Sequence, residues 1–152
     1  MTIRPLAAAD VPALSAALAA LPLLQRYGRT AEAIARDLGS APSRQESVLV
    51  LDDGAARGLV WFTTTGALGS GGYLRLLAVA APTQRRGAGG RLLAAFEAAV
   101  AAVSRDAYLL VSDFNVDAQR FYARHGYAQV GLLPRKVLPD VDELLYWKRL
   151  TA

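Results

Sequence analysis

The sequence contains no cysteine and only one histidine, His125. A chain without thiols forms no disulfide and has no cysteine nucleophile, and a single histidine without cysteine excludes a His/Cys zinc site. Lysine is scarce as well, because only Lys136 and Lys148 occur and arginine supplies the remaining positive side chains. We therefore expect neither thiol chemistry nor a bound metal.

Long apolar runs are missing too. No stretch reaches the roughly 18 uninterrupted apolar residues of a membrane span, and residues 1–14 do not show a basic segment followed by an apolar one. These absences predict a cytoplasmic protein with no membrane partner. The composition that is present, 53% hydrophobic and 20% charged residues in 152 positions, is typical of one globular domain spanning residues 1–152.

The net charge is +4. A positive balance favours a polyanionic ligand such as a nucleotide cofactor. Because the arginines are dispersed along the chain rather than clustered, an interaction domain that binds nucleic acid is the least favoured class of protein.

Hydrophobic periodicity predicts two helices in the first third of the chain. Apolar residues at helical spacing indicate a helix that begins near Asp10 and ends at Pro22. An exposed connector is expected over residues 22–29. The second helix should begin behind Thr30, a possible N-cap, and end at Gly39.

The rest of the chain alternates strands with helices. Residues 47–65 predict an antiparallel hairpin around Asp53-Gly54, and a mostly apolar strand over 73–80 should be closed by Pro82. A helix over 89–103 should bury one face, made of Leu92, Leu93, Phe96, Val100 and Val103. The remaining predicted elements are strands over 1–6, 107–113, 128–133 and 143–150 and a helix over 117–126.

This order of elements predicts a mixed α/β sheet with helices on both faces. The strand over 73–80, the helix over 89–103 and the strand over 107–113 make a right-handed crossover unit, so the two strands should be parallel. The segment QRRGAGG, residues 84–90, then follows the carboxyl end of the first of them, where ligands bind in such sheets.

Glycines in front of a helix let backbone amides approach a phosphate. Two known phosphate loops do not fit residues 84–90. A Walker A loop needs Lys followed by Ser or Thr, but Arg91 and Leu92 follow Gly90. The dinucleotide fingerprint needs a third glycine where Leu92 stands. Taken alone, the segment is compatible with a phosphate site or with a solvated turn.

Two patterns, taken together, favour the phosphate site. Residues 84–90 meet the pattern Q/R-x-x-G-x-G/A through Gln84, Gly87 and Gly89. Residues 115–127, NVDAQRFYARHGY, meet the pattern N-x-x-A-x-x-x-Y-x-x-x-G-[FY]. With both patterns at these places in the order of elements, the sequence resembles the GNAT superfamily of acetyl-CoA-dependent N-acetyltransferases. The resemblance covers nearly the whole chain and is closest from residue 73 to residue 148.

The resemblance implies a GNAT-like, mostly antiparallel twisted sheet of about seven strands with one parallel, splayed pair, flanked by about four helices. It also implies acetyl-CoA as co-substrate and no metal. The pantetheine arm would pair with the strand before the loop, and the pyrophosphate would bind the loop itself. The cofactor-binding residues implied in this way are Leu77, Ala78, Val79, Gln84, Arg85, Arg86, Gly87, Ala88, Gly89, Gly90, Arg91, Asn115 and Tyr122.

The resemblance gives Tyr122 the role of general acid, which protonates the departing thiolate. A backbone amide of Leu77 or Val79 would stabilise the oxyanion. Simpler interpretations exist for two of these residues, because Tyr122 is compatible with a packed tyrosine and Asn115 with a helix-entry residue. His125 is interpreted as a helix cap and not as a catalyst.

The general base is not implied by any motif. Many family members carry a glutamate in the strand before the loop, but here that strand contains Arg75 and no carboxylate. Four alternatives stay open: a water relay, an acceptor that arrives neutral, Asp113 and Glu143.

The expected partner is an amine acceptor, either a small molecule or a protein or peptide N-terminus, bound by a monomer or homodimer. Residues 23–29, the hairpin end near Thr64 and residues 134–143 are expected to surround it, with Trp61 as either a packing residue or part of the cleft. The competing hypothesis is a noncatalytic acyl-CoA-binding sensor, which the missing glutamate favours.

Overall fold

The computed structural model of the chain describes residues 1–80 and 87–151. The strands in this part are β1 (Thr2–Pro5), β2 (Ser47–Asp52), β3 (Ala56–Ala67), β4 (Gly71–Val79), β5 (Asp106–Ser112), β6 (Ala128–Leu133) and β7 (Glu143–Arg149). The α-helices are α1 (Val11–Ala19), α2 (Pro22–Arg26), α3 (Ala31–Ser40), α4 (Ala88–Ala101) and α5 (Val116–Arg124).

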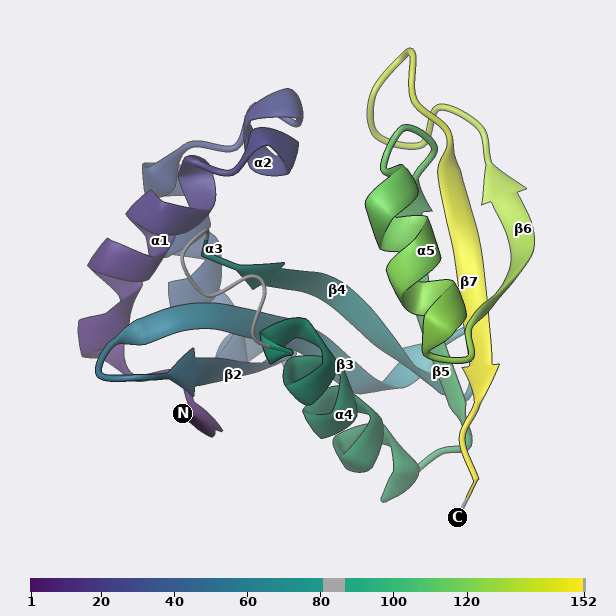
Figure 1. Cartoon of the computed structure of the whole chain (residues 1–152), viewed down its shortest axis with the longest axis horizontal. Helices are drawn as coiled ribbons and strands as arrows, with labels where there is room; N and C mark the ends of the chain where they lie inside the picture. The colour runs from purple at the N-terminus through teal and green to yellow at the C-terminus, as the bar shows by residue number, and fades with distance from the viewer. Residues whose placement is uncertain (81–86, 152) are drawn as a thin grey trace. The chain divides into compact units, whose positions relative to one another are not determined.

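The seven strands form one sheet in the order β1-β2-β3-β4-β5-β7-β6. Strands β4 and β5 are parallel, whereas β1–β2, β2–β3, β5–β7 and β6–β7 are antiparallel (Figure 1). The predicted fold class, a mixed sheet of seven strands with one parallel pair and four longer helices, is confirmed.

Contacts within the chain divide it into two compact units. The first unit comprises Met1–Phe62 and Leu76–Phe96, and the second comprises Thr63–Arg75 and Glu97–Ala152. Strands β3 and β4 and helix α4 each contribute residues to both units. The single domain over residues 1–152 stays a prediction.

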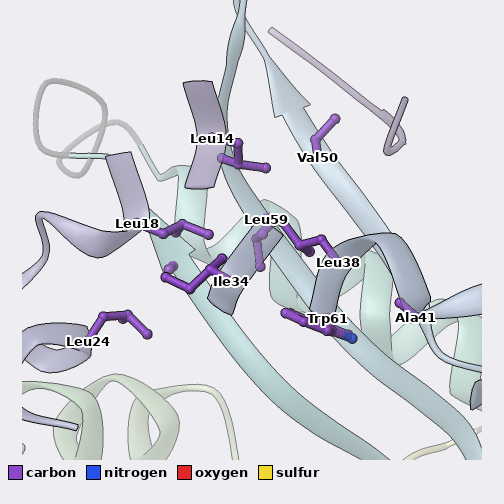
Figure 2. Packing of buried hydrophobic residues seen from close by; sticks show 10 residues of the cluster. Leu14, Leu18, Leu24, Ile34, Leu38, Ala41, Val50, Leu59 and Trp61 are labelled. Carbon is purple, nitrogen blue, oxygen red and sulfur yellow. The ribbon is translucent and has the colours of Figure 1, made fainter. Parts of the chain in front are cut away.

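Helices α1–α3 pack on one face of the strands in the first unit. The cluster in Figure 2 joins residues of these helices, among them Leu14 and Ile34, to Leu59 and Trp61 of β3. Successive strand residues point to opposite faces, so Phe62 lies on the other face, where its ring packs edge-on against Phe96 of α4 with centroids 5.3 Å apart. Trp61 is thereby a core residue, and its Nε1 donates a hydrogen bond to a carboxylate oxygen of Glu46 at 2.9 Å.

Several local predictions are confirmed. The Thr30 hydroxyl oxygen accepts a hydrogen bond from the Ala33 amide at 3.1 Å, which makes Thr30 the N-cap of α3. The β2–β3 hairpin pairs Ser47 with Phe62 at its open end. Strand β4 covers the predicted range apart from its ends, and the predicted stop at Pro82 lies outside the described residues.

Three helix predictions are wrong. Residues 22–29 are not only a connector, because Pro22 occupies the first turn of the short helix α2, where its missing N–H costs no hydrogen bond. Gly39 does not end α3, which continues to Ser40. Val103 does not extend the buried face of α4, since the helix ends at Ala101 and the Val103 side chain is 62% exposed.

The second unit is organised around β7. Strand β5 pairs with β7 from Asp106↔Arg149 to Ser112↔Glu143 without a break. On its other side β5 pairs with β4 from Gly72↔Ala107 to Leu74↔Leu109. Helix α5 lies along β5 and β7 (Figure 1).

Gly58 lets β3 approach β4 in the first unit. A Cβ at this position would lie 2.8 Å from the Ala78 carbonyl oxygen and 3.2 Å from the Val79 Cα, both of them backbone atoms. We expect Gly58→Ala to lower the free energy of unfolding by about 1–3 kcal/mol, because the backbone must move to admit the methyl group. Urea denaturation followed by circular dichroism measures this change.

Gly39→Ala is the matched control. Nothing lies within 4 Å of a Cβ at this position inside α3, so alanine should raise the free energy of unfolding by roughly 0.5–1 kcal/mol through its better helix propensity. Equal effects of the two substitutions would contradict the close approach at Gly58.

Candidate active site

In the first unit, the structure places the described part of the glycine segment at the start of α4. Gly87 adopts a left-handed backbone conformation with φ of 70°, and its carbonyl oxygen accepts the Arg91 amide at 3.1 Å. The amides of Ala88, Gly89 and Gly90 form the first turn and so have no acceptor within the helix.

This helix start fits a pyrophosphate. Three first-turn amides and the positive end of the helix dipole favour an anion, and two of the three residues are glycines with no side chain in the way. The first turn of α4 contains no acidic residue that would oppose a phosphate.

The remaining first-unit predictions are partly described. Leu77, Ala78 and Val79 lie in the last third of β4. The Arg91 side chain donates a hydrogen bond to the Met1 carbonyl oxygen at 3.0 Å. The predicted residues Gln84, Arg85 and Arg86 lie outside the described residues.

The second unit contains the two other predicted residues, both at helix α5. The Asn115 side-chain oxygen accepts the Ala118 amide at 3.2 Å, so Asn115 is the N-cap of this helix. His125 is the C-cap residue, and its Nδ1 lies 2.8 Å from the Phe121 carbonyl oxygen. The helix therefore begins and ends with residues of the second sequence pattern.

Tyr122 is buried, with 7% of its surface exposed. Its ring packs edge-on against those of Phe121 and Tyr127, at centroid distances of 5.1 and 5.7 Å. Burial raises the pKa of the Tyr122 hydroxyl well above its usual value, because the tyrosinate anion would lose its hydration. The hydroxyl therefore keeps its proton near neutral pH.

A charged network that sequence reasoning missed joins Tyr127, which follows α5, to Lys148 of β7 through Glu97 of α4. The Tyr127 hydroxyl donates to Glu97 at 3.1 Å, and the Lys148 ammonium donates to the other Glu97 oxygen at 2.9 Å. The same ammonium lies 5.6 Å from the centre of the Tyr127 ring. Burial and the Glu97 carboxylate together raise the pKa of Tyr127. Glu97 and Lys148 are 51 residues apart, so no local sequence pattern indicates their pairing.

Both carboxylates considered as bases lie at the carboxyl end of β5, but they differ in their surroundings. Asp113 is exposed, and its side chain accepts the Asp142 amide at 3.1 Å while its own amide donates to the Asp142 carbonyl at 2.9 Å. Glu143, the next residue, is only 6% exposed and pairs in register with the equally buried Ser112.

The negative charge of the buried Glu143 carboxylate affects the pKa of Tyr73, a tyrosine of β4. The pKa of Tyr73 is raised, mainly by burial and further by the negative charge of Glu143, while the positive charge of Arg75 opposes this shift. Glu143, Tyr73 and Arg75 therefore form one electrostatic cluster within the second unit.

Comparison with known families identifies the chain. A family model described as "Acetyltransferase (GNAT) domain" matches residues 44–129, which is more than half of the sequence. The chain belongs to the GNAT acetyltransferase family. The matched range includes the glycine segment, Asn115 and Tyr122. A search of curated proteins finds no match to this sequence.

Solved structures agree with this fold. A GNAT-family acetyltransferase from Desulfovibrio desulfuricans superposes with a TM-score of 0.80 at 18% identity, covering 99% of each chain. An aminoglycoside 6'-N-acetyltransferase complexed with coenzyme A gives 0.78 at 18% identity, covering 100% of this chain and 98% of that one. Ribosomal-protein-alanine N-acetyltransferase from Brucella melitensis gives 0.75 at 20% identity, covering 99% and 100%.

The described residues contain no candidate for a membrane-spanning helix or for a metal site. No helix there is long and apolar enough to cross a membrane. In the same part of the chain, no three His, Asp or Glu side chains lie together in a way that would hold a metal ion.

The Asn115 cap contributes to the free energy of unfolding, and this contribution is measurable. We expect Asn115→Ala to lower the free energy of unfolding by about 1 kcal/mol, because the Ala118 amide loses its acceptor. Asn115→Asp should retain nearly all of the stability, since aspartate caps helices as well as asparagine does. Urea denaturation of both variants tests the assignment, and equal losses would contradict a capping role.

Proposed function

We propose that this protein is an N-acetyltransferase that moves the acetyl group of acetyl-CoA to an amine by direct attack within a ternary complex. The observation that carries the proposal is the start of α4, where three first-turn amides, two of them from glycines, open the helix that comes after β4 in a chain of the GNAT family. This arrangement supports acetyl-CoA as the donor and gives no information about the identity of the acceptor.

The first unit would bind the donor through backbone groups. The amides of residues 88–90 would donate to the pyrophosphate, and the β4 residues Leu77, Ala78 and Val79 would pair with the pantetheine arm. The segment 84–86 supplies further polar and positive side chains in the sequence, namely Gln84, Arg85 and Arg86. When bound, acetyl-CoA supplies a thioester whose carbonyl carbon accepts the amine.

Tyr122 would supply the proton for the leaving thiolate. The Tyr122 hydroxyl stays protonated because it is buried, and a general acid of this kind contributes roughly 10²-fold or more to the rate. Asn115 would orient Tyr122 indirectly, because it fixes the first turn of the same helix.

The acceptor is a small-molecule amine or an amine of a peptide. Related folds are named for both kinds of substrate, aminoglycosides in one case and a ribosomal-protein alanine in another. An assay panel should therefore contain an aminoglycoside, a polyamine and a peptide with N-terminal alanine.

Donor binding is tested by thermal unfolding. At acetyl-CoA concentrations about 100-fold above Kd, we expect Tm to rise by about 5–10 °C, because a ligand that binds only the folded state stabilises it by about 2.7 kcal/mol. Gly89→Asp should abolish most of this shift, since a carboxylate in the first turn of α4 repels phosphate. Ala98→Asp places the same charge on an exposed position later in α4 and should leave the shift unchanged. Absence of any shift with the native protein would refute acetyl-CoA binding.

The role of Tyr122 is tested by thiol release. We expect Tyr122→Phe to lower kcat by about 10²-fold, with the acetyl-CoA-induced rise in Tm retained, because only the proton donor is removed. Tyr146→Phe is the matched control, as Tyr146 is another tyrosine of the second unit with 7% exposure, and its rate should stay close to that of the native protein. Full activity of Tyr122→Phe at all pH values would contradict the acid assignment. A native protein that binds acetyl-CoA but acetylates no amine would instead be an acyl-CoA sensor.

A further inference from the structure

The antiparallel pairing of β5 with β7 sorts the side chains of the second unit onto two faces. Residues directly opposite each other in register share a face, and alternate residues change face. Leu109 and Val111 of β5 therefore share a face with their partners Tyr146 and Leu144, and Lys148 continues this row along β7. Glu143 lies on the opposite face, together with Ser112.

Helix α5 covers the first of these faces. Its C-terminal end is fixed there by the contacts of Tyr127 and Lys148 with Glu97, and a Cβ on Gly126, two residues after the helix, would lie 3.4 Å from the Lys148 side chain. Tyr122, which packs against Tyr127, belongs to this layer. Tyr122 and Glu143 are therefore on opposite sides of the β5–β7 pair.

The face that carries Glu143 is more open along most of its length. Tyr108, Leu110, Leu145 and Trp147 are all half-buried, whereas Glu143 and Ser112 at the carboxyl end of β5 are each only 6% exposed. Charged side chains are rarely buried to this extent. The burial of Glu143 thus coincides with the end of β5 where the register with β4, which stops at Leu74↔Leu109, no longer applies.

We propose that Glu143 is the general base of the reaction, binding the ammonium group of the acceptor and accepting its proton on the side of the sheet opposite Tyr122. This inference rests on the proposed acetyl transfer and supplies the base that β4 lacks. Asp113 is the weaker choice because it is exposed, whereas Glu143 is buried.

The proton balance requires two separate groups. The acceptor ammonium gives one proton to Glu143, and the neutral amine forms the C–N bond with the acetyl carbon. The C–S bond breaks with its electron pair on sulfur, which takes a proton from Tyr122, and the second proton lost from nitrogen restores Tyr122. Glu143 then releases its proton to water. Acid and base on opposite faces do not neutralise each other by direct hydrogen bonding.

The groups that face Glu143 come from three neighbouring strands. Tyr73 and Arg75 of β4 belong to the same electrostatic cluster, Ser112 is the register partner of Glu143 on β5, and Leu133 is its register partner on β6.

The test compares Glu143→Gln with the native protein, using an amine that the native protein acetylates. We expect kcat/KM at pH 7 to fall by about 10²-fold, while the acetyl-CoA-induced rise in Tm is unchanged. The pH profile should change as well. With an alkylamine acceptor whose pKa is near 10, the native protein uses the ammonium form and gives a level kcat/KM between about pH 7 and 9. The variant uses only the free amine, so its kcat/KM should climb about tenfold per pH unit over this range.

A binding measurement gives a readout apart from turnover. Calorimetric titration of the amine into the protein with bound CoA should show at least about a tenfold weaker Kd for Glu143→Gln, because a charge-assisted hydrogen bond to the ammonium is lost. Asp113→Asn is the matched control and should leave Kd and the pH profile unchanged. If Glu143→Gln is unfolded, Glu143→Asp replaces it, and we then expect a reduced rate with the level pH profile retained.

The outcomes separate this inference from the proposed function. If the native protein turns over and Glu143→Gln has the same rate and pH profile, the base assignment alone is overturned. The same conclusion follows if Glu143→Asp keeps the full rate but loses the level pH profile. A loss confined to Asp113→Asn would assign the base to Asp113 instead. Failure of the native protein to acetylate any amine, despite binding acetyl-CoA, would overturn both proposals.

Discussion

The unbroken antiparallel register between β5 and β7 determines where the reactive side chains of the second unit lie. Seven consecutive residue pairs, from Asp106↔Arg149 to Ser112↔Glu143, run without a bulge, so each side chain stays on the face that the register gives it. A shift by one residue would exchange Glu143 with Leu144 and would turn Lys148 away from Glu97. The contacts of Tyr127 and Lys148 with Glu97 therefore depend on the same register that places Glu143 on the opposite face. The position of Tyr122, which packs against Tyr127, depends on it as well.

The first unit depends on a different constraint, the geometry of a helix start. Its candidate donor site consists mainly of backbone amides, and the side-chain requirement is chiefly that bulk be absent. That requirement explains why glycine spacing is informative in the sequence: Gly87 has a positive φ, and Gly89 and Gly90 bring no side chain to the first turn of α4. A site made of backbone groups leaves a compact sequence pattern, whereas a site made of distant side chains does not.

This difference accounts for what could be predicted from the sequence. The hairpin around Asp53-Gly54, the Thr30 cap and the parallel strand pair follow from local rules of turns, caps and crossovers, and the structure confirms them. The error at Pro22 arises because proline ends one helix and begins another with equal ease, so its position alone does not decide between a connector and α2. Val103 continues the helical spacing of α4, but the helix ends before it.

The sequence leaves the general base open among four alternatives, Glu143 included, for a related reason. Strand β4 was the place to look because the family pattern puts a glutamate there, and Arg75 stands in a strand without any carboxylate. In a sheet, however, residues far apart in the sequence meet through neighbouring strands, and the order β4-β5-β7 brings the start of β7 to the carboxyl end of β5. The mutual hydrogen bonds of Asp113 and Asp142 fix that junction. A carboxylate at the start of β7 is therefore available for the role of base that no residue of β4 fills. Of the two carboxylates considered for that role, Glu143 is buried and Asp113 is exposed, a difference that the sequence alone does not reveal.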